Sequence, residues 1–303
     1  MSSSGRASTS ITLQGLAFSA LAWLALVACL WLPPLDAQVQ LVVLSPVILL
    51  LGVPHGALDI VFVRQFGNVR STAGWLLFIM AYVMTAAAVM VLWWFAPGFF
   101  LAAFLLVSVF HFSGDPDGET SVLFRTLYGG AVIFCPMTLH APEVSQLFAS
   151  LAGVPAAQAI VAALQWAAWP WMAAIVLAAI AGAKREPARS VELISVTAIL
   201  TFAPPLIGFT LFFCGMHSAR HMIRTRDYCS AGTLRKLLRI AAWPMLVTVI
   251  GVVIAWWLTD GKPPDMRLTQ LLFVGLAALT VPHMIVVERV RFTGWAIGRS
   301  IST

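Results

Sequence analysis

Long apolar runs alternate with short polar breaks along almost the whole chain of 303 residues. Most runs reach the roughly 20 residues that a helix needs to cross the hydrocarbon core of a bilayer. We therefore predict an all-α polytopic membrane helix bundle of about ten transmembrane spans, with eight or nine as alternatives. The predicted spans are 11–32, 38–63, 74–96, 98–113, 120–139, 157–182, 191–203, 205–223, 236–258 and 268–288.

Two of the predicted spans are irregular. Segment 98–113 follows Pro97 almost without a loop, and segment 191–203 is short and ends before Pro204 and Pro205. Each of them is compatible with a re-entrant segment or with a merger into its neighbour, which is why the predicted count extends from eight to ten.

Composition supports a membrane protein, because 60% of the residues are hydrophobic and only 10% are charged. Soluble domains carry roughly 25% charged residues. No polar stretch is long enough for an inserted soluble domain, so we expect a single integral membrane domain over 1–303. It would begin with a short polar tail, 1–10, and end in a cytoplasmic tail, 289–303. The four cysteines form no CxxC pair and are interpreted as small apolar residues.

Basic residues gather in alternate breaks between the predicted spans. With the N-terminus inside, the outer loops keep only Lys262 and Arg267. This asymmetry follows the positive-inside rule and predicts that both termini are cytoplasmic. The net charge of +6 is then a matter of topology, and nucleic acid is not an expected partner. The predicted inner residues include Arg64, Arg70, Arg125, Arg189, Arg220, Arg224 and Arg239, and we expect Arg220 to anchor the inner surface.

Five of the six histidines fall in four predicted spans at similar depth. They are His55, His111, His217, His221 and His283, whereas His140 falls on the outer side as a surface or packing residue. His217 and His221 stand four residues apart and so share one helix face. A single buried histidine is commonly a satisfied packing residue, but ionisable groups gathered inside a membrane are costly and usually functional. A cluster of imidazoles suits iron, zinc or copper, and open positions favour ferrous iron used with dioxygen.

Two acidic residues accompany these histidines. Asp59 lies four residues after His55, where it would either accept the second imidazole N–H or pair with Arg64. Asp115 closely follows His111, either as a solvated loop acid or as a hydrogen-bond partner that supports the site. Both are candidate supporting residues of the predicted metal site.

Prolines precede two of the histidines, as Pro54 and Pro282. Proline removes a helix hydrogen bond. The freed backbone would either help to admit metal or substrate, or serve packing alone, as it does in many membrane helices.

Four motifs at these residues resemble the signatures of the Brp/Blh family, which are bacterial and archaeal membrane β-carotene 15,15′-dioxygenases. The motifs are PHGALD at 54–59, HFSGD at 111–115, HSARH at 217–221 and PHM at 282–284. Their order and spacing cover the chain from about residue 40 to 290, and the combination of PHGALD with HSARH is the most specific part.

The resemblance implies an iron(II) enzyme of the bacterial inner membrane that cleaves the central double bond of β-carotene with O2 to give two all-trans-retinal. It also implies that a retinal-using microbial rhodopsin is a partner, besides the lipid bilayer. His283 matches a further motif histidine, either a ligand or a substrate-side residue. The histidines that match the family's iron ligands are His55, His111, His217 and His221.

Three other functions stay open at this point. A membrane hydroxylase or desaturase would hold two irons and usually shows HxxHH clusters, which the sequence lacks. A transporter of metal ions or protons would place polar residues at the midplane of broken helices. A non-catalytic rhodopsin-associated protein would keep the site without turnover. The number of irons per chain separates the first of these from a cleavage dioxygenase.

Overall fold

The structure is a computed structural model that describes residues 3–66, 69–116, 120–228 and 233–289. Every regular element within these ranges is a helix, and no strand occurs in them. The all-α prediction is therefore confirmed. Most of the predicted C-terminal tail, 290–303, and Cys229 lie outside the described residues.

The helices follow one another with short connections. Three short segments depart from α-helical geometry: the π-helical η1 (Ile48–Gly52) and η3 (Phe212–Ser218), and the 3-10 helix η2 (Val53–Leu58). The α-helices are α1 (Ser3–Trp31), α2 (Ala37–Val47), α3 (Asp59–Phe66), α4 (Thr72–Phe95), α5 (Pro97–Phe112), α6 (Val122–Phe134), α7 (Pro136–Leu139), α8 (Ala141–Ala152), α9 (Val154–Gly182), α10 (Pro187–Phe202), α11 (Pro205–Leu211), α12 (Ala219–Tyr228), α13 (Leu234–Leu258) and α14 (Pro264–Arg289).

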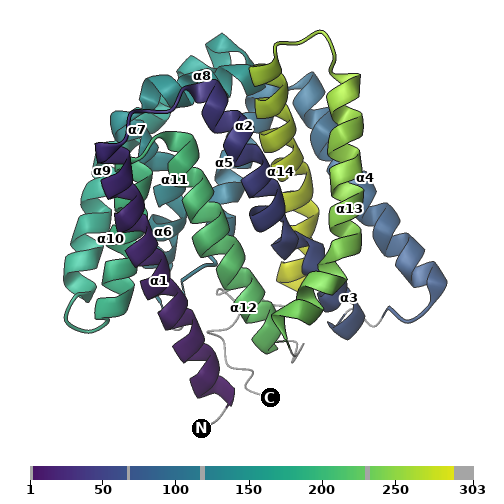
Figure 1. Cartoon of the computed structure of the whole chain (residues 1–303), viewed down its shortest axis with the longest axis horizontal. Helices are drawn as coiled ribbons and strands as arrows, with labels where there is room; N and C mark the ends of the chain where they lie inside the picture. Colours follow the sequence, from purple (N-terminus) through teal and green to yellow (C-terminus); the bar gives the residue numbers. More distant parts are fainter. Residues whose placement is uncertain (1–2, 67–68, 117–119, 229–232, 290–303) are drawn as a thin grey trace.

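The chain runs up and down through one bundle (Figure 1). Helix α1 begins, and α14 ends, at the lower end in this view. Four of the segments that run downward are α2 to α3, α5, α11 to α12, and α14. All five histidines of the predicted cluster lie on these four segments. Residues far apart in sequence can therefore meet at one depth.

In the part of the chain that the structure describes, seven helices are long and apolar enough to cross a membrane by length and composition. They are 9–31, 37–64, 72–95, 122–139, 154–182, 234–258 and 264–288. Of the other three predicted spans, α5 and α10 have only 16 residues each. The third is the helix from Pro205 to Tyr228, whose last part carries several charged residues. The chain is thus a membrane protein, and its count of ten spans stays a prediction.

Helix α8 was not predicted from the sequence. Glu143, Gln146 and Ser150 interrupt its apolar positions, so the segment does not appear as an apolar run. Its apolar face is nonetheless buried, with Val144 and Leu151 each 5% exposed. The helix ends at Gly153, whose φ of 81° lies in the region that glycine adopts most readily.

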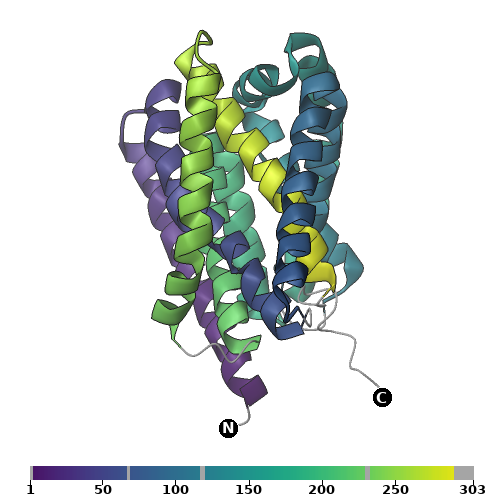
Figure 2. The ribbon, with the colours of Figure 1, turned by 90° about the vertical axis from the view of Figure 1, so that its right-hand side faces the viewer.

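The outer and inner helices differ in burial. None of the residues Thr72–Phe95 of α4, all of them described, is buried, as expected for a helix facing lipid. Helix α14 crosses the bundle obliquely between α13 and α4 (Figure 2).

Among the described cysteines, Cys135 is buried, Cys29 and Cys214 are half-buried, and all three are free thiols.

Candidate metal centre

Two irregular helix segments carry the central histidines. Pro54 has no N–H to donate, and around it the helix changes from π geometry in η1 to 3-10 geometry in η2, where His55 lies. His217 lies in the π segment η3, and single π turns within helices are frequent at functional sites. Helix α14, in contrast, stays α-helical through Pro282, so this proline does not open the helix beside His283.

The two irregular segments pack directly against each other. The Ser218 hydroxyl donates to the carbonyl oxygen of Leu51 over 2.8 Å, which gives that irregular backbone a partner. A Cβ atom on Gly52 would lie only 2.3 Å from Cε1 of Phe213, so glycine is what allows this close approach. The chain thereby brings His55 and His217 together, with 4.8 Å between their ring centroids.

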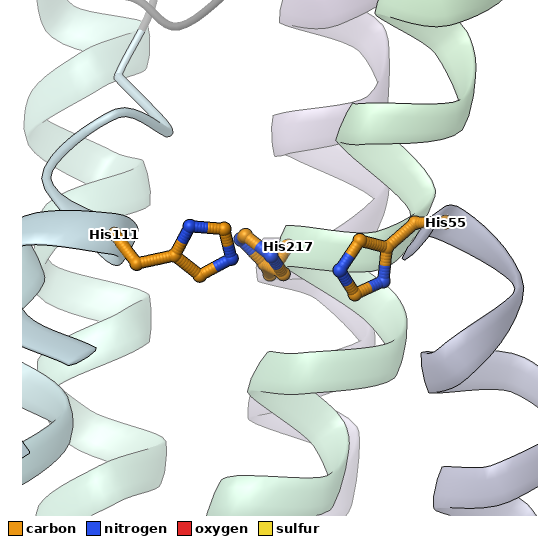
Figure 3. A group of neighbouring side chains, drawn as sticks. All are labelled: His55, His111 and His217. Atoms are coloured by element: carbon orange, nitrogen blue, oxygen red, sulfur yellow. The ribbon is translucent and has the colours of Figure 1, made fainter. Parts of the chain in front are cut away.

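Five imidazole rings gather at this junction. All are buried, with exposed fractions between 2% and 9%. Adjacent rings have centroid separations of 4.5 to 5.4 Å, while the pairs His55–His111 and His217–His221 are each separated by 6.4 Å. Nitrogen atoms of His55, His111 and His217 lie within 4.8 Å of one another. Figure 3 shows these three rings converging from separate elements.

Oxygen atoms behind the rings orient three of them through Nδ1. His55 Nδ1 is 2.5 Å from the carbonyl oxygen of Gly52. His217 Nδ1 is 2.9 Å from a carboxylate oxygen of Asp115, and His283 Nδ1 is 2.7 Å from Asp59 Oδ1. Because carbonyl and carboxylate oxygens only accept hydrogen bonds, each Nδ1 carries the proton. In a neutral imidazole held in this way the lone pair lies on Nε2, which is the form that ligates a metal.

The structure corrects both sequence interpretations of Asp59. It neither orients His55 nor pairs with Arg64; it accepts hydrogen bonds from His283 and, over 3.1 Å, from the hydroxyl of Tyr82. Sequence spacing suggested a partner within the same helix, whereas the observed partners come from α14 and α4.

Asp115 is buried beside the cluster and is not a solvated loop acid. Only 4% of it is exposed, and both of its carboxylate oxygens lie within 3.0 Å of His217 Nδ1. The structure therefore excludes the first of the two alternatives that the sequence left open, and support of a metal site by Asp115 stays a prediction.

The assignment of arginines to the inner surface is wrong for three of them. Arg125, Arg220 and Arg224 are 3%, 1% and 8% exposed. Arg220 forms a two-fold ion pair with Glu192, with N–O distances of 2.7 and 2.8 Å, and its Nε donates to Gln14. These charges belong to the interior around the cluster, so they do not contribute to the topology signal in the way that we expected.

An apolar cavity adjoins the histidines. His111 and Phe213 line it, together with residues of α6, α8 and α14, and it encloses about 970 Å³ of space free of protein atoms, part of it open to the surroundings. Along α5 its wall extends from Leu101 to His111, a rise of roughly 15 Å. Ser108, one of the few polar residues of the wall, donates its hydroxyl to the carbonyl oxygen of Phe104. The cavity is therefore elongated and almost entirely apolar.

His140 stands apart from the cluster. It lies between α7 and α8, with Nδ1 3.5 Å from a carboxylate oxygen of Glu143. Within the described part of the chain, its hydrogen bonds and ion pair are local to this turn.

Comparison with known proteins identifies the family of the chain. The model of the family "Beta-carotene 15,15'-dioxygenase" matches residues 46–290, most of the chain. The chain belongs to this family. The matched region contains all five clustered histidines and both buried aspartates, and the family resemblance of the motifs is confirmed.

Two relatives with assigned names extend the comparison. The β-carotene 15,15′-dioxygenase of uncultured marine bacterium 66A03 is 29% identical over 260 residues, covering 80% of this chain and 90% of that protein. The probable β-carotene 15,15′-dioxygenase Blh of Halobacterium salinarum is 25% identical over 281 residues, covering 78% and 80%. No solved structure shows significant similarity to the chain.

Some residues around the site were missed in the sequence. Tyr82, Arg125 and Arg224 contact Asp59 or the segment after His111. Arg224 stands four residues after Arg220 and so shares its helix face, but this spacing does not indicate that the face is buried. Tyr82 had no usable signal, because nothing in a uniformly apolar span marks which residue faces inward.

Proposed function

We propose that the chain cleaves the central 15,15′ double bond of β-carotene with O2 to give two all-trans-retinal, using iron(II) held by His55, His111, His217 and His221. The observation that carries this proposal is the cluster of buried, oriented imidazoles beside an elongated apolar cavity in a member of this family. His283 is proposed as a fifth histidine facing the same ion.

The spacing of the rings supports one shared ion. With a metal–nitrogen distance of about 2.1 Å, an imidazole centroid lies roughly 3.2 Å from the metal. Two ligands at a right angle would then have centroids about 4.5 Å apart, and two opposite ligands about 6.4 Å apart. Six pairs of rings, at 4.5 to 5.4 Å, lie at or somewhat above the first value, and two pairs, at 6.4 Å, lie at the second.

Orphaned nitrogen atoms support the same assignment. Nε2 of His217 and Nε2 of His283 are buried and have no hydrogen-bond partner among the described residues. A buried polar atom without a partner is costly. Coordination of a cation by the lone pair removes that cost, and the neutral imidazoles leave the charge of ferrous iron uncancelled.

The surrounding residues hold this arrangement before substrate arrives. Gly52, Asp115 and Asp59 fix the tautomers and ring planes of His55, His217 and His283. The Thr225 hydroxyl, 3.4 Å from Nδ1 of His221, lies behind the fourth proposed ligand. Such outer partners keep the lone pairs directed inward, which limits the reorganisation needed for metal binding.

The cavity would accept one half of the polyene. Its wall is formed by residues such as Phe104, Val132, Phe148 and Phe209, which suit an apolar chain and exclude water. His111 belongs to both the cavity wall and the cluster, so a chain lying along α5 would present a double bond to the metal centre. Exclusion of water protects reactive oxygen chemistry from side reactions.

Ferrous iron would supply the binding and activation of O2. Both oxygen atoms enter product, one in each retinal aldehyde, so turnover consumes no reductant. We further propose that residues 1–303 form a single domain in the bacterial inner membrane, that the polyene enters from the bilayer, and that a microbial rhodopsin receives the retinal.

Expression in bacteria that accumulate β-carotene tests the proposal. Extracted pigments should lose β-carotene and gain all-trans-retinal, and His217→Ala should abolish the conversion. His140→Ala is the matched control, since this histidine lies outside the cluster, and it should cleave normally. Iron-loaded protein that leaves β-carotene unchanged would contradict the proposal.

Metal content separates the alternative functions. One iron per chain with retinal formation supports cleavage, whereas two irons with hydroxylated or desaturated product would favour a hydroxylase or desaturase. Metal uptake into vesicles without oxygen consumption would favour a transporter. An iron-loaded protein without any turnover would favour a non-catalytic rhodopsin-associated role.

A further inference from the structure

Three buried arginines surround the segment Ser113–Pro116, which follows His111. Arg125 Nη1 donates to the carbonyl oxygen of Pro116 over 2.9 Å and lies 3.5 Å from that of Ser113. Arg224 donates to the two consecutive carbonyl oxygens between them, those of Gly114 at 2.8 Å and Asp115 at 2.6 Å. Every carbonyl group of this short segment is thus held by a guanidinium.

The third arginine, Arg220, reaches the same backbone from another direction. Its Nη1 is 3.2 Å from the carbonyl oxygen of Asp115, while its other hydrogen bonds go to Glu192 and Gln14. Helix α1, through Gln14, and helix α10, through Glu192, therefore help to hold this arginine in place. The segment is connected to four surrounding helices, α1, α6, α10 and α12.

Burial of these charges calls for an explanation. Taking a charged group out of water is costly even when it is paired. Backbone carbonyl groups at a helix end are ordinarily satisfied by water, by a tightened turn or by a small capping group. This segment is distinguished by the residues that it positions. His111 lies two residues before it, and the Asp115 carboxylate that contacts His217 lies within it.

We propose that Arg224, assisted by Arg220 and Arg125, is a positioning residue of the metal centre, which fixes the segment after His111 so that Asp115 meets His217. Arg224 follows His217 and His221 on the same continuous helix. Its guanidinium therefore connects the helix of these two histidines to the segment that follows His111. The inference rests on the proposed metal centre and concerns metal binding, without depending on which carotenoid is cleaved.

The planar fork of arginine is what this role requires. Two N–H groups of one guanidinium meet two adjacent carbonyl oxygens, which a lysine ammonium cannot reproduce with the same geometry. Loss of an outer partner of a metal ligand typically weakens metal affinity by about 10 to 100-fold. We expect losses in this range for Arg224→Met and a smaller loss for Arg224→Lys, which keeps the charge and one donor.

The experiment measures ferrous iron binding to purified, detergent-solubilised full-length protein under anaerobic conditions, by competition with a chromophoric chelator. The matched control is Arg226→Met, two residues further along the helix. Arg226 is 38% exposed and pairs with Asp227. Thermal unfolding of the metal-free protein is recorded for each variant. A positioning role predicts weaker iron binding in Arg224→Lys with a metal-free melting temperature close to that of Arg226→Met. Arg224→Met also removes both donors to buried carbonyl oxygens, so it should bind iron more weakly still and melt at a lower temperature.

A second variant tests the route through Asp115. Asp115→Asn should weaken iron binding by itself, and adding Arg224→Lys should weaken it little further, because both changes act on one hydrogen bond to His217. Should Arg224→Met fail to fold, Arg224→Lys and this double variant carry the test.

The possible outcomes are distinct. Iron binding of Arg224→Lys and Arg224→Met equal to that of the wild-type protein overturns the inference and leaves the proposed function intact. Equal weakening in Arg226→Met, or fully additive losses with Asp115→Asn, also overturns it. A wild-type protein that binds no iron overturns the proposed metal centre and the inference together.

Discussion

Replacing Asp59 by asparagine tests whether His283 faces the metal. The two carboxylate oxygens of Asp59 accept from different donors, Oδ1 from His283 and Oδ2 from Tyr82. The side chain is 2% exposed, so water cannot substitute for either bond. Asparagine offers one oxygen and one NH2 group. Its oxygen can accept from His283 only when the NH2 group faces Tyr82, whose hydroxyl must then accept from the amide and donate to the carbonyl oxygen of Leu279 instead. Even in that orientation His283 loses a charged acceptor.

The expected effect follows from the loss of that charged acceptor. A hydrogen bond to a charged group contributes about 1.5–3 kcal/mol, more than one to a neutral amide oxygen. If the His283 ring changes tautomer to accept from the amide, its Nε2 becomes protonated and can no longer ligate. Loss of an outer partner weakens metal affinity by about 10 to 100-fold. At about 1.4 kcal/mol per factor of ten, this corresponds to about 1.4–2.8 kcal/mol, in agreement with the cost of the lost hydrogen bond.

Anaerobic titration of ferrous iron against a competing chelator measures the effect. Tyr82→Phe is the matched control, because it removes the second hydrogen bond of Asp59 and leaves the one to His283 in place. We expect it to lower stability by about 0.5–1.5 kcal/mol with iron affinity unchanged. If Asp59→Asn binds iron as tightly as wild type while the KM for β-carotene rises, His283 faces substrate and the ligand assignment is refuted.

Three further predictions follow from the packing around the site. Gly52→Ala should lower the free energy of unfolding by about 1–3 kcal/mol, because its methyl group would overlap Phe213. Gly275→Ala is the control: the space around the added methyl is open, so thermal stability should stay unchanged. Leu147→Trp should fill part of the apolar cavity and raise the KM for β-carotene more than the KM for a shorter apocarotenal. Equal effects on both substrates in a turnover assay would contradict the proposed position of the polyene in this cavity. Removal of iron by a chelator should abolish cleavage, and added ferrous iron should restore it. If elemental analysis shows that the protein is free of iron and it is still fully active, iron is not required for cleavage.

The sequence by itself determined the class of the protein and the candidate ligands. Apolar runs of span length require helices, because in lipid every backbone polar group must be satisfied within its own segment. Histidine is rare inside membranes, so His55, His111, His217, His221 and His283 stood out against an apolar background. The local effect of Pro54 on its helix could also be anticipated, since it depends only on the missing N–H group.

Only the tertiary structure decided which residues support these histidines. Asp59 and His283 are 224 residues apart, so sequence spacing favoured wrong neighbours of Asp59 within one helix. Asp115 and His217 are 102 residues apart, so spacing offered no partner for Asp115. Arg220 and Arg224 could not be distinguished from surface anchors, because the positive-inside rule counts charges and does not say which of them face inward. Helix rotation and packing fix those directions, and they depend on contacts among many segments that no single stretch of sequence contains.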